Sequence, residues 1–188
     1  MYRLNNFEDF YNEKRKLDSC MDLKKELPEN MFTNQYDKFF FSEFDLWGSA
    51  SFWEILQNLT KHYEDTHVQV AVLDPHPEKY FYAHFNHYNW VNIPITVNDD
   101  EYFDIITSDP LNSPADALMY NSIKVVWTSE SNNWVMYGDR EVSLIVVGVI
   151  GENTYLSSNE LFLRKSELLG LQDIVHPDLL KRVYSNFR

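Results

Sequence analysis

Hydrophobic residues recur every three or four positions in several stretches of the chain, the spacing typical of amphipathic helices. Asn5 or Asn6 can cap the first of these, a helix predicted from Phe7 to about Leu27 with Pro28 as its stop. The first thirty or so residues are also candidates for a loosely packed N-terminal helix. The same spacing, together with capping residues and prolines, predicts five more helices: Ser49 or Ser51 to about Tyr63, Glu78–His87, Asp99–Ile106, Asn159–Leu169 and Pro177–Phe187.

A different pattern, short apolar runs rich in β-branched residues, predicts strands. Because the last three runs are separated only by short polar turns, we expect them to pair antiparallel. Leu144–Ile150 has no polar face and is placed at the centre of the sheet. The aromatic stretch Met31–Trp47 has no clean period and fits either a strand or a helix. The predicted strands are Val68–Asp74, Ser122–Thr128, Trp134–Tyr137 and Val142–Ile150.

Together these patterns predict a single α+β domain spanning residues 1–188, with a central antiparallel sheet and helices before and after it. The 13 Phe, 12 Tyr and 5 Trp supply ample bulk for one core. No apolar run is long enough for a membrane helix, and the N-terminus lacks the apolar core of a signal peptide. With Cys20 as the one cysteine, we expect a reducing compartment, the cytoplasm.

The negative charge of the chain is concentrated in one stretch. Most of the net charge of −13 falls between Asp37 and Asp109, a stretch with 13 acidic and 3 basic residues. Such a surface disfavours nucleic acid, because phosphate contacts require basic side chains. It favours a basic protein partner, since opposite fields steer association, although acidity is also a common device for solubility.

Candidate catalytic and metal-binding groups are few. His76, His84 and His87 could offer imidazoles to zinc, but a third firm ligand is missing and the aromatic neighbours favour packing in a surface groove. We therefore predict neither a metal nor another cofactor. The acids of the predicted helix at 99–106 could serve acid–base chemistry, yet helix capping and the helix dipole account for them better. With 5 glycines and no recognisable nucleophile–base pair, we expect a protein without catalytic residues.

The segment Asn132–Glu141 predicts a hairpin in which an aromatic strand leads into a charged turn. Gly138 and Asp139 are expected to make the turn, and Arg140 either bonds the neighbouring carboxylates or stays solvated. The pattern Ser129-x4-Trp134-x-x-Tyr137-x-Asp139-Arg140, followed by an apolar strand, resembles a C-terminal segment of immunity proteins from bacterial polymorphic toxin systems. The likeness covers about thirty residues. It implies a small, cytoplasmic, non-catalytic protein that binds and blocks a cognate toxin.

The resemblance and the acidic charge lead to one functional hypothesis, a cytoplasmic immunity-type protein that neutralises a basic protein toxin. A non-catalytic structural or interaction protein unrelated to toxins is the alternative, and a metal- or carboxylate-dependent hydrolase is the third. We expect carboxylates to set the approach of the partner and exposed aromatics to anchor it. Residues Trp134, Tyr137, Gly138, Asp139 and Arg140 are expected to be structural. The expected partner-binding residues are Asp74, Glu78, Tyr80, Tyr82, Tyr88, Trp90, Asp99, Asp100, Glu101 and Asp104.

Overall fold

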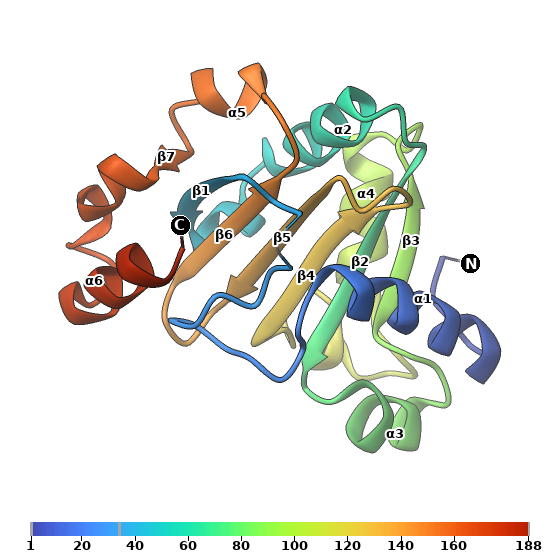
Figure 1. The fold of residues 1–188 in the computed structure, drawn as a ribbon. Helices are drawn as coiled ribbons and strands as arrows, with labels where there is room; N and C mark the ends of the chain where they lie inside the picture. The colour runs from blue at the N-terminus through green and yellow to red at the C-terminus, as the bar shows by residue number, and fades with distance from the viewer. Residues whose placement is uncertain (1, 34, 188) are drawn as a thin grey trace.

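The computed structural model describes residues 2–33 and 35–187, and its centre is an antiparallel sheet. The strand order is β3-β2-β4-β5-β6-β1-β7 (Figure 1). The predicted meander is confirmed, because β4, β5 and β6 are neighbours in chain order. The strands are β1 (Lys38–Glu43), β2 (His67–Asp74), β3 (Trp90–Pro94), β4 (Lys124–Ser129), β5 (Trp134–Asp139), β6 (Leu144–Val149) and β7 (Leu163–Arg164).

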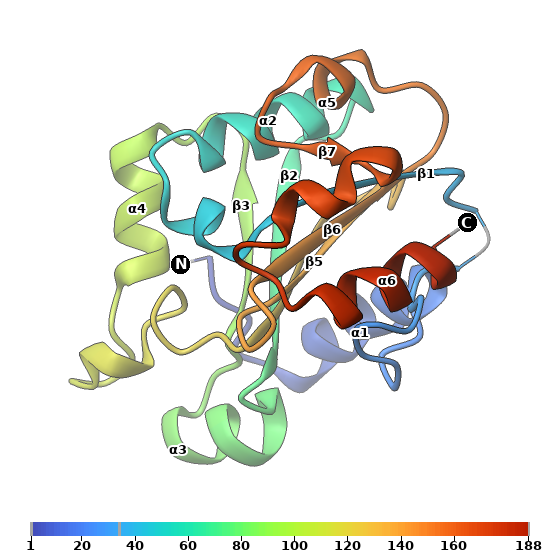
Figure 2. The ribbon, with the colours of Figure 1, turned by 90° about the vertical axis from the view of Figure 1, so that its left-hand side faces the viewer.

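Helices cover both faces of this sheet, so the domain has three layers and the predicted α+β class is confirmed (Figure 2). The helices α2 (Phe52–His62) and α4 (Asp99–Thr107) lie on one face, and α1 (Phe7–Cys20) and α6 (Pro177–Asn186) lie on the other. Alternate strand residues enter the two cores, as Trp127 and Val126 of β4 show. Every residue of β6 is buried, which explains why this strand has no polar face in the sequence.

The first helix begins as predicted and ends earlier. Asn6 caps it by accepting a hydrogen bond from the Asp9 amide at 2.8 Å. Helix α1 ends at Cys20 rather than near Leu27, because Met21 turns into extended backbone and forms a bridge with Phe32. In this arrangement the apolar residues after Cys20 are buried against the sheet outside a helix. The helix itself is packed onto the sheet by fully buried Phe10, Leu17 and Cys20.

The region before the meander contains β1, in a stretch that fitted either a strand or a helix, and β3, which the pattern did not predict. The ambiguous stretch Met31–Trp47 holds β1 and the start of a 3-10 helix, η1 (Phe44–Gly48). Strand β3 follows a π-helix, η2 (Pro77–Tyr82), and one turn of α-helix, α3 (Ala83–Phe85), where a single helix was predicted. Backbone bonds from Leu4 to Trp90 and from Tyr88 to Leu4, 3.0 and 2.8 Å long, add the N-terminal segment beside β3.

The prediction of a helix over Asn159–Leu169 is wrong, while the last helix, α6, is confirmed. Asn153 caps a shorter helix, α5 (Thr154–Ser158), by accepting from the Leu156 amide at 2.9 Å. The chain then pairs with β1 as β7 before forming a 3-10 helix, η4 (Lys165–Leu171). Pairing with the sheet edge satisfies backbone groups that a continuous helix would have satisfied internally.

Gly138 lies inside β5 and not in the hairpin turn, which corrects the prediction. The turn falls at residues 140–143, where Ser143 has a φ of 56°. A Cβ on Gly138 would lie 2.9 Å from the Trp127 ring and 3.0 Å from the Phe44 ring. The glycine is therefore required by close packing of aromatic rings on the face covered by α2 and α4.

Candidate functional site

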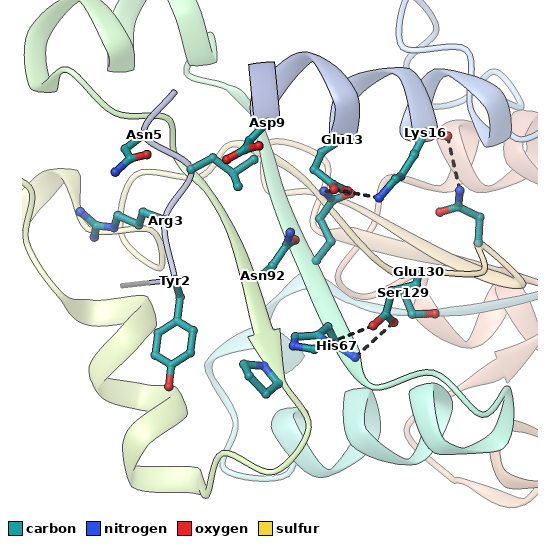
Figure 3. Close-up of a pocket in the computed structure, with 14 residues that line it drawn as sticks. Tyr2, Arg3, Asn5, Asp9, Glu13, Lys16, His67, Asn92, Ser129 and Glu130 are labelled. Atoms are coloured by element: carbon teal, nitrogen blue, oxygen red, sulfur yellow. Dashed lines mark hydrogen bonds and ion pairs between the residues drawn. The ribbon is translucent and has the colours of Figure 1, made fainter. Parts of the chain in front are cut away.

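Two hollows on opposite faces of the sheet are candidate sites. The first, here called the polar groove, lies between α1 and the ends of β2, β3 and β4 (Figure 3). Its volume is about 510 Å³. Asn92 lies on its sheet side, while Glu13 and Lys16 project from α1 (Figure 3). Gln69 of β2 also lines the groove. Polar residues here replace the apolar ones found under the rest of α1.

The charged groups of the polar groove are mostly bonded to one another. Glu13 accepts from Gln69 at 3.0 Å and pairs with Lys16 at 2.8 Å. Across the groove, His67 Nδ1 lies 2.9 Å from Glu130 Oε1. Because these charged groups bond to one another, the polar groove has mainly a structural role. Its contacts hold α1 and the turn between β4 and β5 against the sheet.

Glu130 is held by several donors. Thr66 donates its hydroxyl to the carboxylate at 2.7 Å, and the amide of His67 donates at 3.1 Å. Partial burial opposes ionisation, but these hydrogen bonds outweigh it and lower the pKa of Glu130. Ser129, the hydroxyl in the groove wall, donates to Asp65 at 2.6 Å and not to His67. The Thr66 hydroxyl lies 2.8 Å from His67 Nδ1 and donates its proton to Glu130, so the geometry shows a carboxylate held jointly by a hydroxyl, an amide and a histidine.

The second hollow, here called the Trp47 groove, lies on the opposite face beside η1 and α4. It consists of two adjoining cavities of about 420 and 270 Å³, which share Trp47, Gly48, Ser49 and Met119. The larger cavity is also lined by Phe44, Asp45, Tyr120 and Arg140, and the smaller by Ala50, Trp53, Asp99, Asp100, Tyr102, Phe103 and Ile106.

The aromatic walls of the Trp47 groove are fixed by their own packing. Trp53 stacks on Tyr102 with ring centroids 4.4 Å apart, and its indole N–H donates to the Val97 carbonyl at 2.8 Å. Trp47 makes an edge-to-face contact with Trp127 at 5.0 Å. Burial raises the pKa of the Tyr102 hydroxyl, so this wall stays neutral at physiological pH. The walls are thus formed before any ligand arrives.

The rim of the Trp47 groove combines exposed rings with carboxylates. Phe103 is 52% exposed and Tyr120 is 54% exposed. Asp99 and Asp100 are exposed in the first turn of α4, and Asp104 is one turn further on. Within the described ranges, the ion pairs involve none of these three aspartates.

Helix capping accounts for only one acid of α4. Asn98 accepts from the Glu101 amide at 2.9 Å, and Glu101 accepts from the Asn98 amide at 3.1 Å. This capping box confirms the predicted start of the helix. It uses the Glu101 carboxylate and leaves those of Asp99 and Asp100 free for other contacts.

Arg140 lies at the far end of the Trp47 groove, and its donors point to the backbone. It donates to the Met119 carbonyl at 2.7 Å and to the Tyr120 carbonyl at 3.3 Å, and its guanidinium lies 5.1 Å from the Phe44 ring centre. Of the two alternatives for Arg140, a charged network with Asp139 and Glu141 is absent from the described ion pairs. Arg140 instead holds the loop that carries Tyr120.

The other hairpin residues are internal. Trp134 and Tyr137 are buried on opposite faces of the sheet. Asp139 is buried beside them and accepts from the Glu141 amide at 3.0 Å. Burial raises the pKa of this carboxyl, partly offset by the charge of Lys124.

The expectation that Tyr88 and Trp90 are exposed anchors is wrong. They are 2% and 1% exposed, respectively, because they face the core beneath α1. Tyr88 stacks on Phe10 with centroids 3.8 Å apart, and Trp90 donates its indole N–H to the Val72 carbonyl at 2.9 Å. Trp90 takes its orientation from β3, a strand that was not predicted, and Tyr88 lies just before that strand, where its amide donates to the Leu4 carbonyl.

The remaining expected partner residues do not form one surface. Glu78 accepts from Tyr11 of α1 at 2.8 Å, so it belongs to the α1 side of the sheet with Asp74 nearby in β2. Tyr82 stacks on the buried ring of Tyr88 at 4.7 Å, and Tyr80 donates to Asp116 at 2.8 Å. The four acids of α4 lie in the opposite layer (Figure 2).

The three candidate zinc histidines have separate partners. His76 Nδ1 accepts from the Glu78 and Lys79 amides, both at 3.2 Å. His84 lies 2.7 Å from the Tyr80 carbonyl, and His87 lies 3.1 Å from Arg3. Burial, reinforced by Arg3, lowers the pKa of His87. Across residues 2–33 and 35–187, His, Cys, Asp and Glu side chains nowhere gather as three or more potential metal ligands.

The sequence predicted two of the three acids that line the Trp47 groove, Asp99 and Asp100, and missed Asp45 and the rings. One signal was available, since Phe103 and Asp99 are four residues apart and so share a face of α4. A single exposed ring is common on protein surfaces, so this signal alone did not predict a site. Trp47 and Trp53 are close in the sequence, but Met119 and the residues of α4 come from distant segments, and only the fold brings them together.

In the part of the chain that the structure describes, each helix is too short or too polar to cross a bilayer. Comparison of the chain with protein-family models, curated proteins and solved structures finds no match.

Proposed function

We propose that this chain is an immunity-type binding protein that neutralises a basic protein toxin in the cytoplasm, and that it engages the toxin with the rim of the Trp47 groove. One observation carries the proposal. Two exposed aromatic rings, Phe103 and Tyr120, stand among aspartates without ion-pair partners in the described ranges, around an apolar hollow with rigid walls.

This combination suits protein recognition. Aromatic residues dominate the binding energy of interfaces when they enter or line desolvated pockets. Carboxylates around them accelerate the approach of a basic partner and reject acidic ones. The resemblance of residues 129–140 to immunity proteins supports the same function. Those residues lie in the core and in a turn, so the resemblance concerns the scaffold and not the contact surface.

Co-expression with the protein encoded by the adjacent gene tests the proposal. We expect that protein to be toxic alone, to be harmless with this chain, and to co-purify with it. Replacing the three free aspartates of α4 (D99N, D100N, D104N) should reduce the association rate at least about tenfold at low salt, because steering depends on these charges. Added salt should reduce the difference between variant and wild type.

The matched control removes three exposed acids elsewhere, through E8Q, D18N and D173N. It changes the net charge equally, and we expect it to alter the association rate by less than about threefold, since distant charges are screened. An adjacent gene product that is neither toxic nor bound would refute the proposal. Equal losses in the two triple variants would refute the assignment to the α4 rim.

A further inference from the structure

The smaller cavity of the Trp47 groove has the chemistry of a site for one side chain. We infer that it receives an arginine of the partner protein, with the aliphatic part of that side chain between the rings and its guanidinium at Asp99 and Asp100. The inference rests on the proposed function for the source of the arginine, while the cavity and its charge are features of this chain alone.

The shape of the cavity suits a long, narrow side chain. Its volume is about 270 Å³, and its lining includes Gly48, Ser49 and Ala50, which have small side chains or none. A Cβ on Gly48 would make an ordinary van der Waals contact with Met119 at 3.4 Å, so the backbone at Gly48 is not closely covered. The rings of Trp53 and Phe103 also line the cavity.

The two rings of the cavity differ in how firmly the protein holds them. Trp53 is fixed by its stack on Tyr102 and its bond to Val97. Phe103 is half exposed on the surface of α4, so a ligand in the cavity can cover it. A ring that is already fixed reduces the conformational entropy lost on binding.

The electrostatics of the cavity favour a cation. Asp99 and Asp100 bring two negative charges, and Lys, Arg and His are absent from the described residues that line this cavity. The N-terminus of α4 opposes them with roughly half a positive charge. The net charge at the cavity is therefore about −1.5, and this negative charge excludes phosphates and carboxylates as preferred ligands.

Among cations, guanidinium fits better than ammonium. It is planar, weakly hydrated and able to stack on aromatic faces, whereas the ammonium group of lysine holds its water strongly. Its five N–H donors can bond two carboxylates at once. Asp99 and Asp100 are adjacent in one helical turn and both line the cavity, so they can provide these acceptors.

The test uses acetyl-arginine amide as the probe and follows the indole N–H signals of the 15N-labelled protein by NMR. We expect the signals of Trp47 and Trp53 to shift saturably at millimolar probe, and the signal of Trp90, in the opposite core, to stay in place. Acetyl-citrulline amide has the same shape without the charge, and it should bind at least about tenfold more weakly. Acetyl-lysine amide, with its free ammonium group, should also bind more weakly.

Variants locate the site. D100N and F103A should each weaken the arginine probe about threefold or more, while D173N, a distant exposed acid, should leave it unchanged. Asp100 and Phe103 are exposed, so their replacement should not prevent folding, and the indole spectrum reports this directly. Equal binding of the citrulline probe, or absence of any saturable shift at Trp53, would overturn the inference.

The outcomes separate this inference from the proposed function. If the arginine probe binds but the adjacent gene product does not, the cavity assignment stands and the toxin-neutralising function fails. If the toxin binds D100N and F103A as tightly as wild type, the cavity assignment fails and the neutralising function survives on another surface.

Discussion

Replacing Gly138 with alanine tests the packing that places η1 and Trp127 beside each other. The new Cβ would lie 2.9 and 3.1 Å from two atoms of the Trp127 ring and 3.0 Å from the Phe44 ring. Trp127 cannot move aside easily, because it is fully buried and contacts Trp47 and Phe52 with centroids 5.0 and 5.1 Å apart. Overpacking of this kind costs about 1–3 kcal/mol in the free energy of unfolding.

The expected change in melting temperature follows from the length of the chain. At about 2.1 cal/mol/K per residue, 188 residues give an unfolding entropy near 0.4 kcal/mol/K, so G138A should melt about 2–8 °C lower. Thermal unfolding followed by circular dichroism measures this shift. In the control G170A, the new Cβ has no contact closer than 3.4 Å, to Leu163, and we expect no loss of stability. If G138A melts within about 1 °C of wild type, the close approach of the rings to β5 is wrong.

Two further predictions concern the charged residues of the hairpin. Burial raises the pKa of Asp139 in the folded protein above the unfolded value near 3.9. The ionised carboxylate therefore lowers the free energy of unfolding at neutral pH, and this loss of stability disappears as the pH falls through the folded pKa. D139N should therefore increase the free energy of unfolding at pH 7 on the order of 1 kcal/mol, with a smaller gain at pH 3 in urea titrations, and a loss at pH 7 would contradict the assignment. R140A should lower that free energy by about 1–2 kcal/mol and speed amide exchange in residues 117–121, because two carbonyls lose a charged donor. R140K should recover less than half of the loss, since lysine lacks the planar fork, and full recovery would show that charge alone matters.

The sequence alone determined the elements whose signals are local. The starts of α4 at Asp99 and of α6 at Pro177 depend on residues within one or two turns, and the apolar run of β6 depends on residues along one strand. These local signals were sufficient to predict the α+β class and the antiparallel meander. They also predicted that the acids of α4 lie at a helix terminus.

Tertiary structure decided the rest, because the deciding contacts join distant segments. Strands β1 and β3 exist through pairing with β6 and β2. The pairing of β3 and the packing of α1 over it bury Trp90 and Tyr88, which were predicted to be surface anchors. The Trp47 groove likewise gathers η1, α2, α4 and the loop at Met119. Tyr and Trp combine a large apolar ring with a single polar group, which suits both a core and a binding cavity, so contacts with distant segments decide which of the two a ring occupies.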